Sequence, residues 1–212
     1  MRLKAMAKIN LGLDVLGKRE DGYHEVRMIM QTIRMYDILD IRKTRRPGIV
    51  LTTNLPFIPT DQRNLVYKAA QMLMEEFDVE EGLSIKLRKF IPVAAGMAGG
   101  SSDAAAAFVG VNRMFHLGLT EEQLMERAVK VGADVPYCIM RGTALAEGIG
   151  EKLTRLPEVP KCYVLIGKPG INVSTKTAYE NLNLEGIGKH PDIDGLIGAI
   201  RNNDLYAMAS RM

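Results

Sequence analysis

Apolar and polar positions alternate in a stretch near the N-terminus. Ala7 and Leu11 fall on one side of an extended chain, whereas Lys8 and Asn10 fall on the other. Because successive side chains of a β-strand point to opposite faces, this period of two predicts a half-buried strand over residues 7–18. The strand would carry its lysine, amide and carboxylate away from the core.

Later segments show helical and extended patterns in turn. Residues 64–77 place their apolar side chains on one helical stripe, which predicts a helix. Residues 119–132 predict a second helix that begins with a capping box of Thr120 and Gln123. The continuous apolar run at 161–170 predicts a buried strand. Shorter strands are expected at 37–43, 48–53 and 82–90. This order predicts an α+β fold rather than a regular βαβ alternation.

The stretch IPVAAGMAGGSSDAAAAFVG at 91–110 changes abruptly from loop to helix, because alanine favours helix and glycine disfavours it. Ser101 and Ser102 occupy the predicted N-cap positions. The first turn of a helix carries unpaired N–H groups and partial positive charge, and glycines let an anion approach the backbone. Residues 96–102 therefore predict a phosphate cradle. The alternative is a well-capped buried helix whose glycines serve only its turn.

The glycines do not match two familiar phosphate-binding loops. No lysine follows them in the G-K-[ST] position of a Walker A loop. The spacing of Gly96, Gly99 and Gly100 also differs from the G-x-G-x-x-G pattern of dinucleotide-binding folds. Both of those folds are disfavoured, so the cation that phosphate chemistry needs is expected from elsewhere in the chain.

Composition and charge narrow the functional classes. The net charge of +3 over 212 residues is too small to indicate a nucleic-acid partner. The two cysteines lie far apart in apolar runs, and no metal-ligand spacing or disulfide framework is present. No apolar run reaches membrane-spanning length, and the start lacks the apolar core of a signal peptide. These features predict a soluble cytoplasmic protein with no membrane or nucleic-acid partner.

Phosphoryl transfer also needs a group that orients or deprotonates the acceptor hydroxyl. Lys8 is a candidate cation, with a surface lysine on an edge strand as the alternative. Asp134 lies two residues before a proline, so its backbone is predicted to be non-helical and its carboxylate to be able to accept a proton. Alternatively, it caps the next element. Tyr23 and Tyr179 are candidates to sandwich a flat ring whose edge His24 would bond. The alternative for each tyrosine is a packed side chain with its hydroxyl satisfied, which is the commoner case.

Four stretches occur in one order and spacing: AKINLGLDVLGKREDGYHEV, IPVAAGMAGGSSDAAAAFVGVN, GADVPYCIMRGTALAEGIGEKL and KPGINVST. Together they resemble the 4-diphosphocytidyl-2-C-methyl-D-erythritol kinases of the GHMP small-molecule kinase superfamily. The similarity runs from Ala5 to about Thr177. The glycine loop alone would indicate only the superfamily, whereas the combination of Ala-Lys-Ile-Asn-Leu, Asp-Gly-Tyr-His and Gly-Ala-Asp-Val-Pro is specific.

The resemblance implies an ATP-dependent reaction and a role for particular residues. Asp134 would take the proton of the hydroxyl at carbon 2 of the methylerythritol unit, and Lys8 would steady both that carboxylate and the γ-phosphate. The implied substrate residues are Asn10, Tyr23, His24, Thr175 and Tyr179. The implied nucleotide residues are Asn64, Lys89, Pro92, Ala94, Gly96, Met97, Ala98, Gly99, Gly100, Ser101 and Ser102. Mg²⁺ would bridge the ATP phosphates, with no protein ligands predicted for it.

The resemblance also implies a two-domain GHMP kinase fold. A ribosomal protein S5 domain 2-like N-terminal domain would span 1–155, and an incomplete ferredoxin-like α/β C-terminal domain would begin at 156 and run to 212. The partner would be a small molecule, and the protein a monomer or weak homodimer. Two other functions stay open: a GHMP kinase for mevalonate or homoserine, and a non-catalytic nucleotide- or RNA-binding module.

Overall fold

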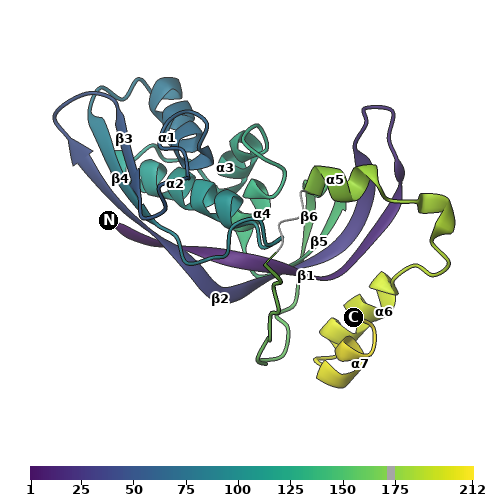
Figure 1. Cartoon of the computed structure of the whole chain (residues 1–212). Helices are drawn as coiled ribbons and strands as arrows, with labels where there is room; N and C mark the ends of the chain where they lie inside the picture. The colour runs from purple at the N-terminus through teal and green to yellow at the C-terminus, as the bar shows by residue number, and fades with distance from the viewer. Residues whose placement is uncertain (171–174) are drawn as a thin grey trace. The chain divides into compact units, whose positions relative to one another are not determined.

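The computed structural model describes residues 1–170 and 175–212 of the chain (Figure 1). Its strands are β1 Arg2–Lys18, β2 His24–Thr44, β3 Ile49–Thr53, β4 Gly82–Arg88, β5 Thr143–Gly148 and β6 Lys152–Leu156. Its helices are α1 Leu65–Glu76, α2 Gly99–Phe115, α3 Glu121–Ala128, α4 Val135–Met140, α5 Thr175–Glu180, the 3-10 helix η1 Leu184–Gly186, α6 Ile193–Arg201 and α7 Leu205–Ala209. The predicted α+β class is confirmed.

The strands pair in the order β3-β4-β2-β5-β6, and β1 pairs with β2. Strand β2 pairs with β4 through its second half, where Ile41 faces Ile85, and with β5 through its first half, where Ile29 faces Leu145. Both pairings are antiparallel, whereas β3 and β4 run parallel. The long strand β2 therefore connects two sets of strands.

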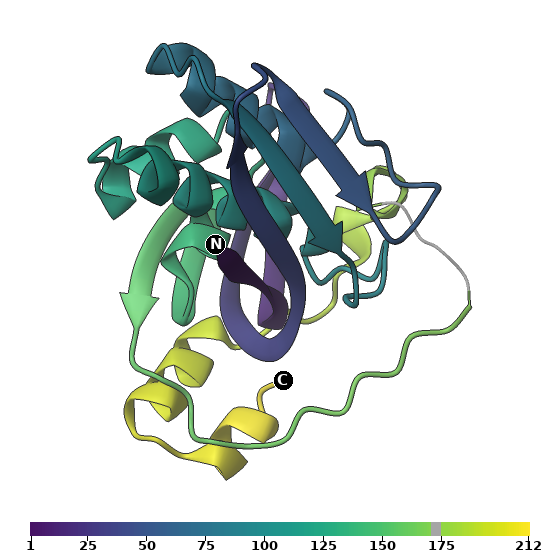
Figure 2. The same ribbon diagram turned by 90° about the vertical axis from the view of Figure 1, so that its left-hand side faces the viewer.

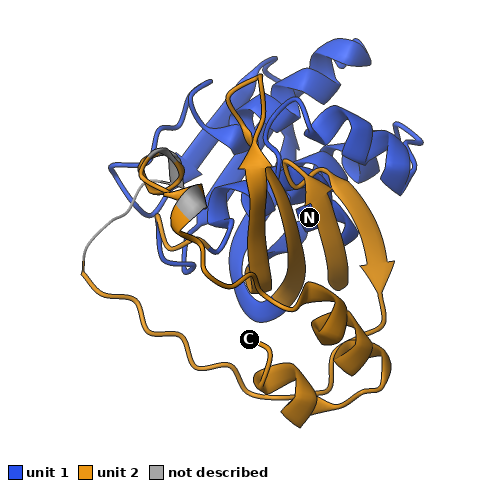
Figure 3. Cartoon of the chain, turned by 90° about the vertical axis from the view of Figure 1, so that its right-hand side faces the viewer, with its two compact units in different colours: residues 1–8, 33–93, 97–140 blue, residues 9–32, 94–96, 141–212 orange. Residues whose placement is uncertain are grey.

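The chain forms two compact units, shown in different colours in Figure 3. Unit 1 comprises residues 1–8, 33–93 and 97–140, and unit 2 comprises residues 9–32, 94–96 and 141–212. Strands β1 and β2 each contribute residues to both units. The predicted domain boundary at residues 155 and 156 falls at the end of β6, inside unit 2, and stays a prediction.

Unit 1 packs its helices on one face of strands β3, β4 and β2 (Figures 1 and 2). Its core includes Leu39, Ile41, Leu73, Leu83, Ile85, Leu87, Phe108 and Val111. Helix α2 lies against the sheet at Gly110, where an added Cβ would be 2.5 Å from the Ile41 Cδ1 atom and 2.7 Å from the Leu3 Cδ1 atom. The small side chains of the alanine-rich helix thus allow its close approach to the strands.

Unit 2 packs the two C-terminal helices α6 and α7 against strands β1, β2 and β5. Its buried cluster comprises Leu11, Ile29, Leu145, Ile193, Leu196, Ile197, Ala199, Ile200 and Met208. A bidentate pair joins Arg27 of β2 to Asp194 of α6, with nitrogen–oxygen distances of 2.9 and 2.6 Å. Apolar burial and this ion pair together hold the C-terminal helices on the strands.

Two expectations about strands are wrong. The polar side of β1 was expected to face away from the core, yet Lys8 and Asp14 are only 5% and 8% exposed. This side is covered as well, because the Lys8 N–H donates to the Met97 carbonyl and Asp14 contacts the His190 ring. The run at 161–170 forms no strand, and its apolar side chains are exposed. A strand needs a hydrogen-bonded neighbour, and no described strand pairs with this run.

The predicted serine N-caps are also wrong. Helix α2 begins at Gly99, and its N-cap is Ala98, a left-handed residue with φ 51° and ψ 33° and no side-chain cap bond. The Ser102 N–H already donates to the Ala98 carbonyl, so Ser102 lies inside the helix. The left-handed residue turns the chain into the helix three residues earlier than a cap at Ser101 would. By contrast, the capping box of Thr120 and Gln123 is confirmed at the start of α3.

Candidate functional site

The two predicted catalytic side chains lie close together in unit 1. Lys8 comes from β1, and Asp134 lies immediately before α4, whose first hydrogen bond runs from the Cys138 N–H to the Asp134 carbonyl. The Lys8 Nζ atom is 3.9 Å from the Asp134 Oδ2 atom. The lysine side chain is 6% exposed and the aspartate side chain 34% exposed. A buried ammonium therefore faces a carboxylate that solvent, and hence a substrate, can reach.

Backbone and side-chain contacts tie this pair to the glycine loop. The Lys8 N–H donates to the Met97 carbonyl over 3.2 Å. The Ser102 hydroxyl donates to the Met6 carbonyl over 2.6 Å and lies 3.4 Å from the Cys138 Sγ atom. Strand β1, the first turns of α2 and helix α4 therefore meet through these contacts, and the lysine and the glycine loop are neighbours within unit 1.

The glycine loop has an unusual backbone that suits an anion. Ala94, Gly96 and Ala98 have φ values of 54°, 69° and 51°. An added Cβ at Gly96 would meet no atom within 4 Å, so glycine there serves conformation and not space. Left-handed residues at alternate positions are a feature of anion nests, in which successive N–H groups turn toward one concave side. The loop ends at the N-terminus of α2, whose first turn carries no acidic side chain.

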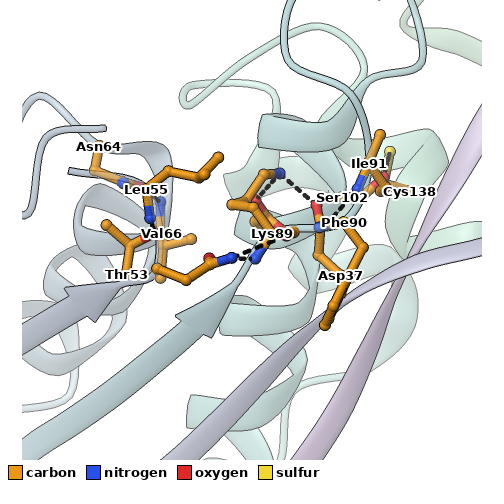
Figure 4. A network of polar contacts seen from close by, with 12 residues as sticks. Asp37, Thr53, Leu55, Asn64, Val66, Lys89, Phe90, Ile91, Ser102 and Cys138 are labelled. Carbon is orange, nitrogen blue, oxygen red and sulfur yellow. Dashed lines mark hydrogen bonds and ion pairs between the residues drawn. The ribbon is translucent and has the colours of Figure 1, made fainter. Parts of the chain in front are cut away.

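The predicted nucleotide residues outside the loop have defined partners. Asn64 is the N-cap of α1: its side-chain oxygen accepts from the Val66 N–H at 2.9 Å, and its amide donates to the Pro59 carbonyl at 2.7 Å. Lys89 is 8% exposed and bonds to the carboxylates of Asp37 and Asp103. Figure 4 shows Lys89 beside Asp37. Both predicted residues therefore have structural contacts of their own.

The carboxylates around Lys89 form a buried charged cluster. Its Nζ atom donates to Asp37 and to the Asp103 Oδ2 atom, the latter over 2.6 Å. Burial raises the pKa of Asp103 to about 8; the Lys89 ammonium opposes this rise and the Asp37 carboxylate adds to it. Sequence reasoning missed both aspartates. The available signals were an aspartate in a run of alanines and another in the apolar strand segment YDILD.

The predicted substrate residues of unit 2 are partly brought together. His24, at the start of β2, stacks on Tyr179 of α5 with ring centroids 5.0 Å apart and an interplanar angle of 28°. Tyr23 is 60% exposed in the preceding turn, so the histidine and not Tyr23 is the ring that meets Tyr179. Asn10 is half-buried on β1. Thr175 begins α5, but its side chain lies outside the described residues.

A separate hollow of about 400 Å³ lies on the polar face of the unit 1 strands. It is lined by Arg2, Asp40, Arg42, Thr52, Ser84, Lys86 and Arg88. None of the predicted site residues lines it. In the described part of the chain, no group of three histidine, cysteine or acidic side chains is placed to hold a metal ion. Among those residues there is also no helix long and apolar enough to cross a membrane.

Comparisons with known proteins find kinases among the relatives of this chain. The family model described as GHMP kinases N terminal domain matches residues 64–142. The chain is 56% identical over its whole length to a 4-diphosphocytidyl-2-C-methyl-D-erythritol kinase of Lachnospira eligens, of which it covers 74%. It is 57% identical over 208 residues to the kinase of the same name from Lachnoclostridium phytofermentans, with 98% of this chain and 72% of that protein covered.

Solved structures give the same picture. A crystal structure of 4-(cytidine 5'-diphospho)-2C-methyl-D-erythritol kinase matches with a TM-score of 0.79 at 29% identity, covering 100% of this chain and 76% of that one. A homoserine kinase from Cytophaga hutchinsonii matches with a TM-score of 0.70 at 18% identity, covering 98% of this chain and 70% of that one. At that identity the second match shows the fold alone.

Proposed function

Because this chain belongs to the 4-diphosphocytidyl-2-C-methyl-D-erythritol kinase family of the GHMP kinases, we propose that it transfers the γ-phosphoryl group of ATP to the 2-hydroxyl of 4-diphosphocytidyl-2-C-methyl-D-erythritol. This reaction belongs to the non-mevalonate route to isoprenoid precursors. The observation that carries the proposal is the position of Lys8. Its ammonium lies 3.9 Å from the Asp134 carboxylate, and its backbone N–H donates to the Met97 carbonyl in the glycine loop.

Unit 1 would supply the groups that act on the phosphoryl transfer. Asp134 would accept the proton of the attacking hydroxyl, since its carboxylate is partly exposed and held at the start of a helix. Lys8 would stabilise the negative charge that develops on the transferred group, because a buried ammonium acts in a low dielectric. The loop at 96–102 would bind the phosphates through its N–H groups and the N-terminus of α2.

Unit 2 would supply the groups that recognise the cytidine. The stacked rings of His24 and Tyr179 provide an aromatic surface, and Tyr23 adds an exposed ring nearby in sequence. Stacking of a base on an aromatic side chain contributes about 1–3 kcal/mol. Asn10 and Thr175 would contribute polar contacts to the same substrate.

We also propose that Mg²⁺ is bound mainly through the phosphates of ATP, because protein-bound Mg²⁺ commonly relies on substrate phosphates with few side-chain ligands. When bound, the ion would offset phosphate charge during transfer. We further propose a cytoplasmic monomer or weak homodimer. Two free cysteines, Cys138 and Cys162, suit a reducing compartment.

A phosphorylation assay over three alcohols tests the proposal. The chain, ATP and Mg²⁺ are incubated with the cytidine-bearing alcohol, mevalonate or homoserine, and ADP release and product mass are measured. We expect phosphorylated product from the cytidine-bearing alcohol alone. Preference for either other alcohol would assign a different GHMP kinase activity. No transfer to any alcohol, together with salt-sensitive binding of RNA, would favour a non-catalytic module instead.

A further inference from the structure

Three buried charged side chains connect the segments on either side of the glycine loop, namely the residues that follow β4 and the first turns of α2. We name Asp37, Lys89 and Asp103 the loop-base triad. At the start of the loop, the Asp37 Oδ1 atom accepts hydrogen bonds from the backbone N–H groups of Phe90 and Ile91, the second over 2.8 Å (Figure 4). These are the two residues that lead into the loop, so β2 holds the point where the chain leaves β4.

The same triad reaches the far end of the loop, on α2. The Lys89 Nζ atom donates to the Oδ2 atom of Asp103, which is the fifth residue of the helix. An added Cβ at Gly99 would lie 3.2 Å from that Nζ atom and 3.2 Å from the Ile91 Cγ2 atom. The ammonium therefore packs directly beneath the first residue of α2, where a larger residue would have to displace it by a few tenths of an ångström.

We propose that the loop-base triad is a positioning device that holds the start of the glycine loop and the N-terminus of α2 at a fixed separation. Asp37 binds the start, Asp103 belongs to the helix, and Lys89 bonds to both. The loop between them contains left-handed alanines, a backbone that persists only when its surroundings impose it. The expected effect of the triad on ATP binding rests on the proposed function. In that function, Lys89 acts by positioning the loop and not by contact with the nucleotide.

The charge balance of the triad supports this role. One ammonium lies between two carboxyl groups, and the pKa of Asp103 is raised to about 8 by burial. The triad is therefore close to neutral at pH 7 and gains a negative charge above pH 8. The Asp103 Oδ1 atom is buried and has no hydrogen-bond partner among the described residues. An ionised Asp103 would place that charge on the second turn of the helix whose N-terminus binds phosphate.

Lys89 and Asp37 are the two charged groups that act on the pKa of Asp103. Helix α1 packs on α2 through apolar residues, and the buried residues of α4 include Tyr137 and Cys138, the latter in contact with Ser102. Strand β1 contributes buried Lys8. A pH effect that disappears in Asp103→Asn therefore reports Asp103 itself.

Hydrogen exchange and ATP kinetics on single variants test the proposal. In Lys89→Met, two buried carboxyl groups lose their cation. We expect amide exchange over 90–103 to speed up about tenfold, with a similar rise in the KM for ATP and a much smaller change in kcat. Asp37→Asn keeps the size and one acceptor oxygen but removes the charge, so both effects should be present and smaller. This second variant decides the question if Lys89→Met does not fold.

A matched variant and a pH series separate positioning from general stability. Glu76→Gln removes an exposed ion pair with Arg127 in the same unit and should leave exchange over 90–103 unchanged. Between pH 7 and pH 9, the KM for ATP of the wild type should rise about threefold or more relative to the KM of Asp103→Asn. Asn has the size and neutrality of the protonated acid, so ionisation of residue 103 contributes nothing to the KM of that variant.

Each result supports or overturns the inference. Wild-type exchange over 90–103 in folded Lys89→Met and Asp37→Asn would overturn it, even if the kinase assay succeeds. Exchange that rises evenly across unit 1 would also overturn it, because it would show a general stabilising role. Faster local exchange in a protein that phosphorylates none of the alcohols would leave the positioning role standing while the proposed function fails.

Discussion

Replacing Asp134 by Asn is the sharpest test of the proposed chemistry. The amide has nearly the same shape as the carboxylate but does not accept a proton from a hydroxyl. The backbone carbonyl of residue 134, which accepts the first hydrogen bond of α4 from Cys138, is retained. The substitution therefore changes the charge and basicity at one point of the site and leaves the start of the helix in place.

The structure limits how much stability this change removes. A separation of 3.9 Å between the Lys8 Nζ and Asp134 Oδ2 atoms corresponds to a gross attraction of about 4 kcal/mol at an effective dielectric constant of about 20. Because the aspartate side chain is 34% exposed, water screens the pair and solvates the remaining groups. We expect a net loss of about 1–2 kcal/mol, which lowers the melting temperature of a chain this size by about 2–8 °C.

The expected loss of activity is much larger than the loss of stability. A positioned general base contributes about 10²–10⁴-fold to rate, so kcat should fall at least about a hundredfold. The coupled release of ADP measures kcat, and titration with a fluorescent ATP analogue measures nucleotide affinity. That affinity should stay within about threefold of wild type, since the carboxylate would act on the acceptor and not on ATP.

Asp61→Asn is the matched control for this experiment. It makes the same chemical change at an exposed carboxylate of unit 1 that pairs with Arg63, away from the glycine loop in sequence. Its kcat should equal that of the wild type. Turnover within about threefold of wild type in Asp134→Asn, at saturating ATP and acceptor, would refute the assignment of Asp134 as the base.

Three further predictions concern packing, buried hydrogen bonds and pH. Gly110→Ala should destabilise the protein by about 1–3 kcal/mol in urea unfolding, because its Cβ would overlap side chains of β1 and β2; Gly198→Ala, where nothing lies within 4 Å, should instead stabilise by about 0.5–1 kcal/mol. Ser102→Ala should cost about 1–3 kcal/mol, since it leaves a backbone carbonyl of β1 without its donor, whereas Ser101→Ala should cost much less. The folded-state pKa of Asp103 lies above its unfolded value, so the folded state holds the extra proton and stability should fall as pH rises from about 4 to about 8. The free energy of unfolding of the wild type should fall with pH more steeply than that of Asp103→Asn, by at most about 1.4 kcal/mol per pH unit. Urea titrations that give the same pH slope for both proteins would contradict the prediction.

Features with a local cause were predictable from the sequence. The capping box of Thr120 and Gln123 depends only on residues three apart, and it forms as expected. The helix expected at 64–77 and the strand expected at 82–90 form as α1 and β4, because their periods are short-range. The order of these elements was enough to predict the α+β class.

Features that depend on distant contacts were not predictable in this way. The alternation around Lys8 identifies two faces of a strand but does not say that the chain covers both. Asp37 and Lys89 are separated by 52 residues and Lys89 and Asp103 by 14, so no window of sequence contains the triad. The run at 161–170 shows the converse, because apolar composition alone does not supply a neighbouring strand.

Strand β1 links the candidate chemistry to the candidate phosphate site. Its residues 6–8 present three groups in sequence order: the Met6 carbonyl to Ser102, the Lys8 N–H to the Met97 carbonyl and the Lys8 ammonium to Asp134. A displacement of β1 along its own axis would therefore alter the loop, the start of α2 and the ion pair at once. The burial of Lys8 has a consequence for chemistry, because an ammonium removed from bulk water and fixed by backbone bonds needs little reorganisation when charge develops beside it. Under the proposed function, the strand's polar face, which looks like a solvent face in sequence, would therefore set the geometry of the transfer.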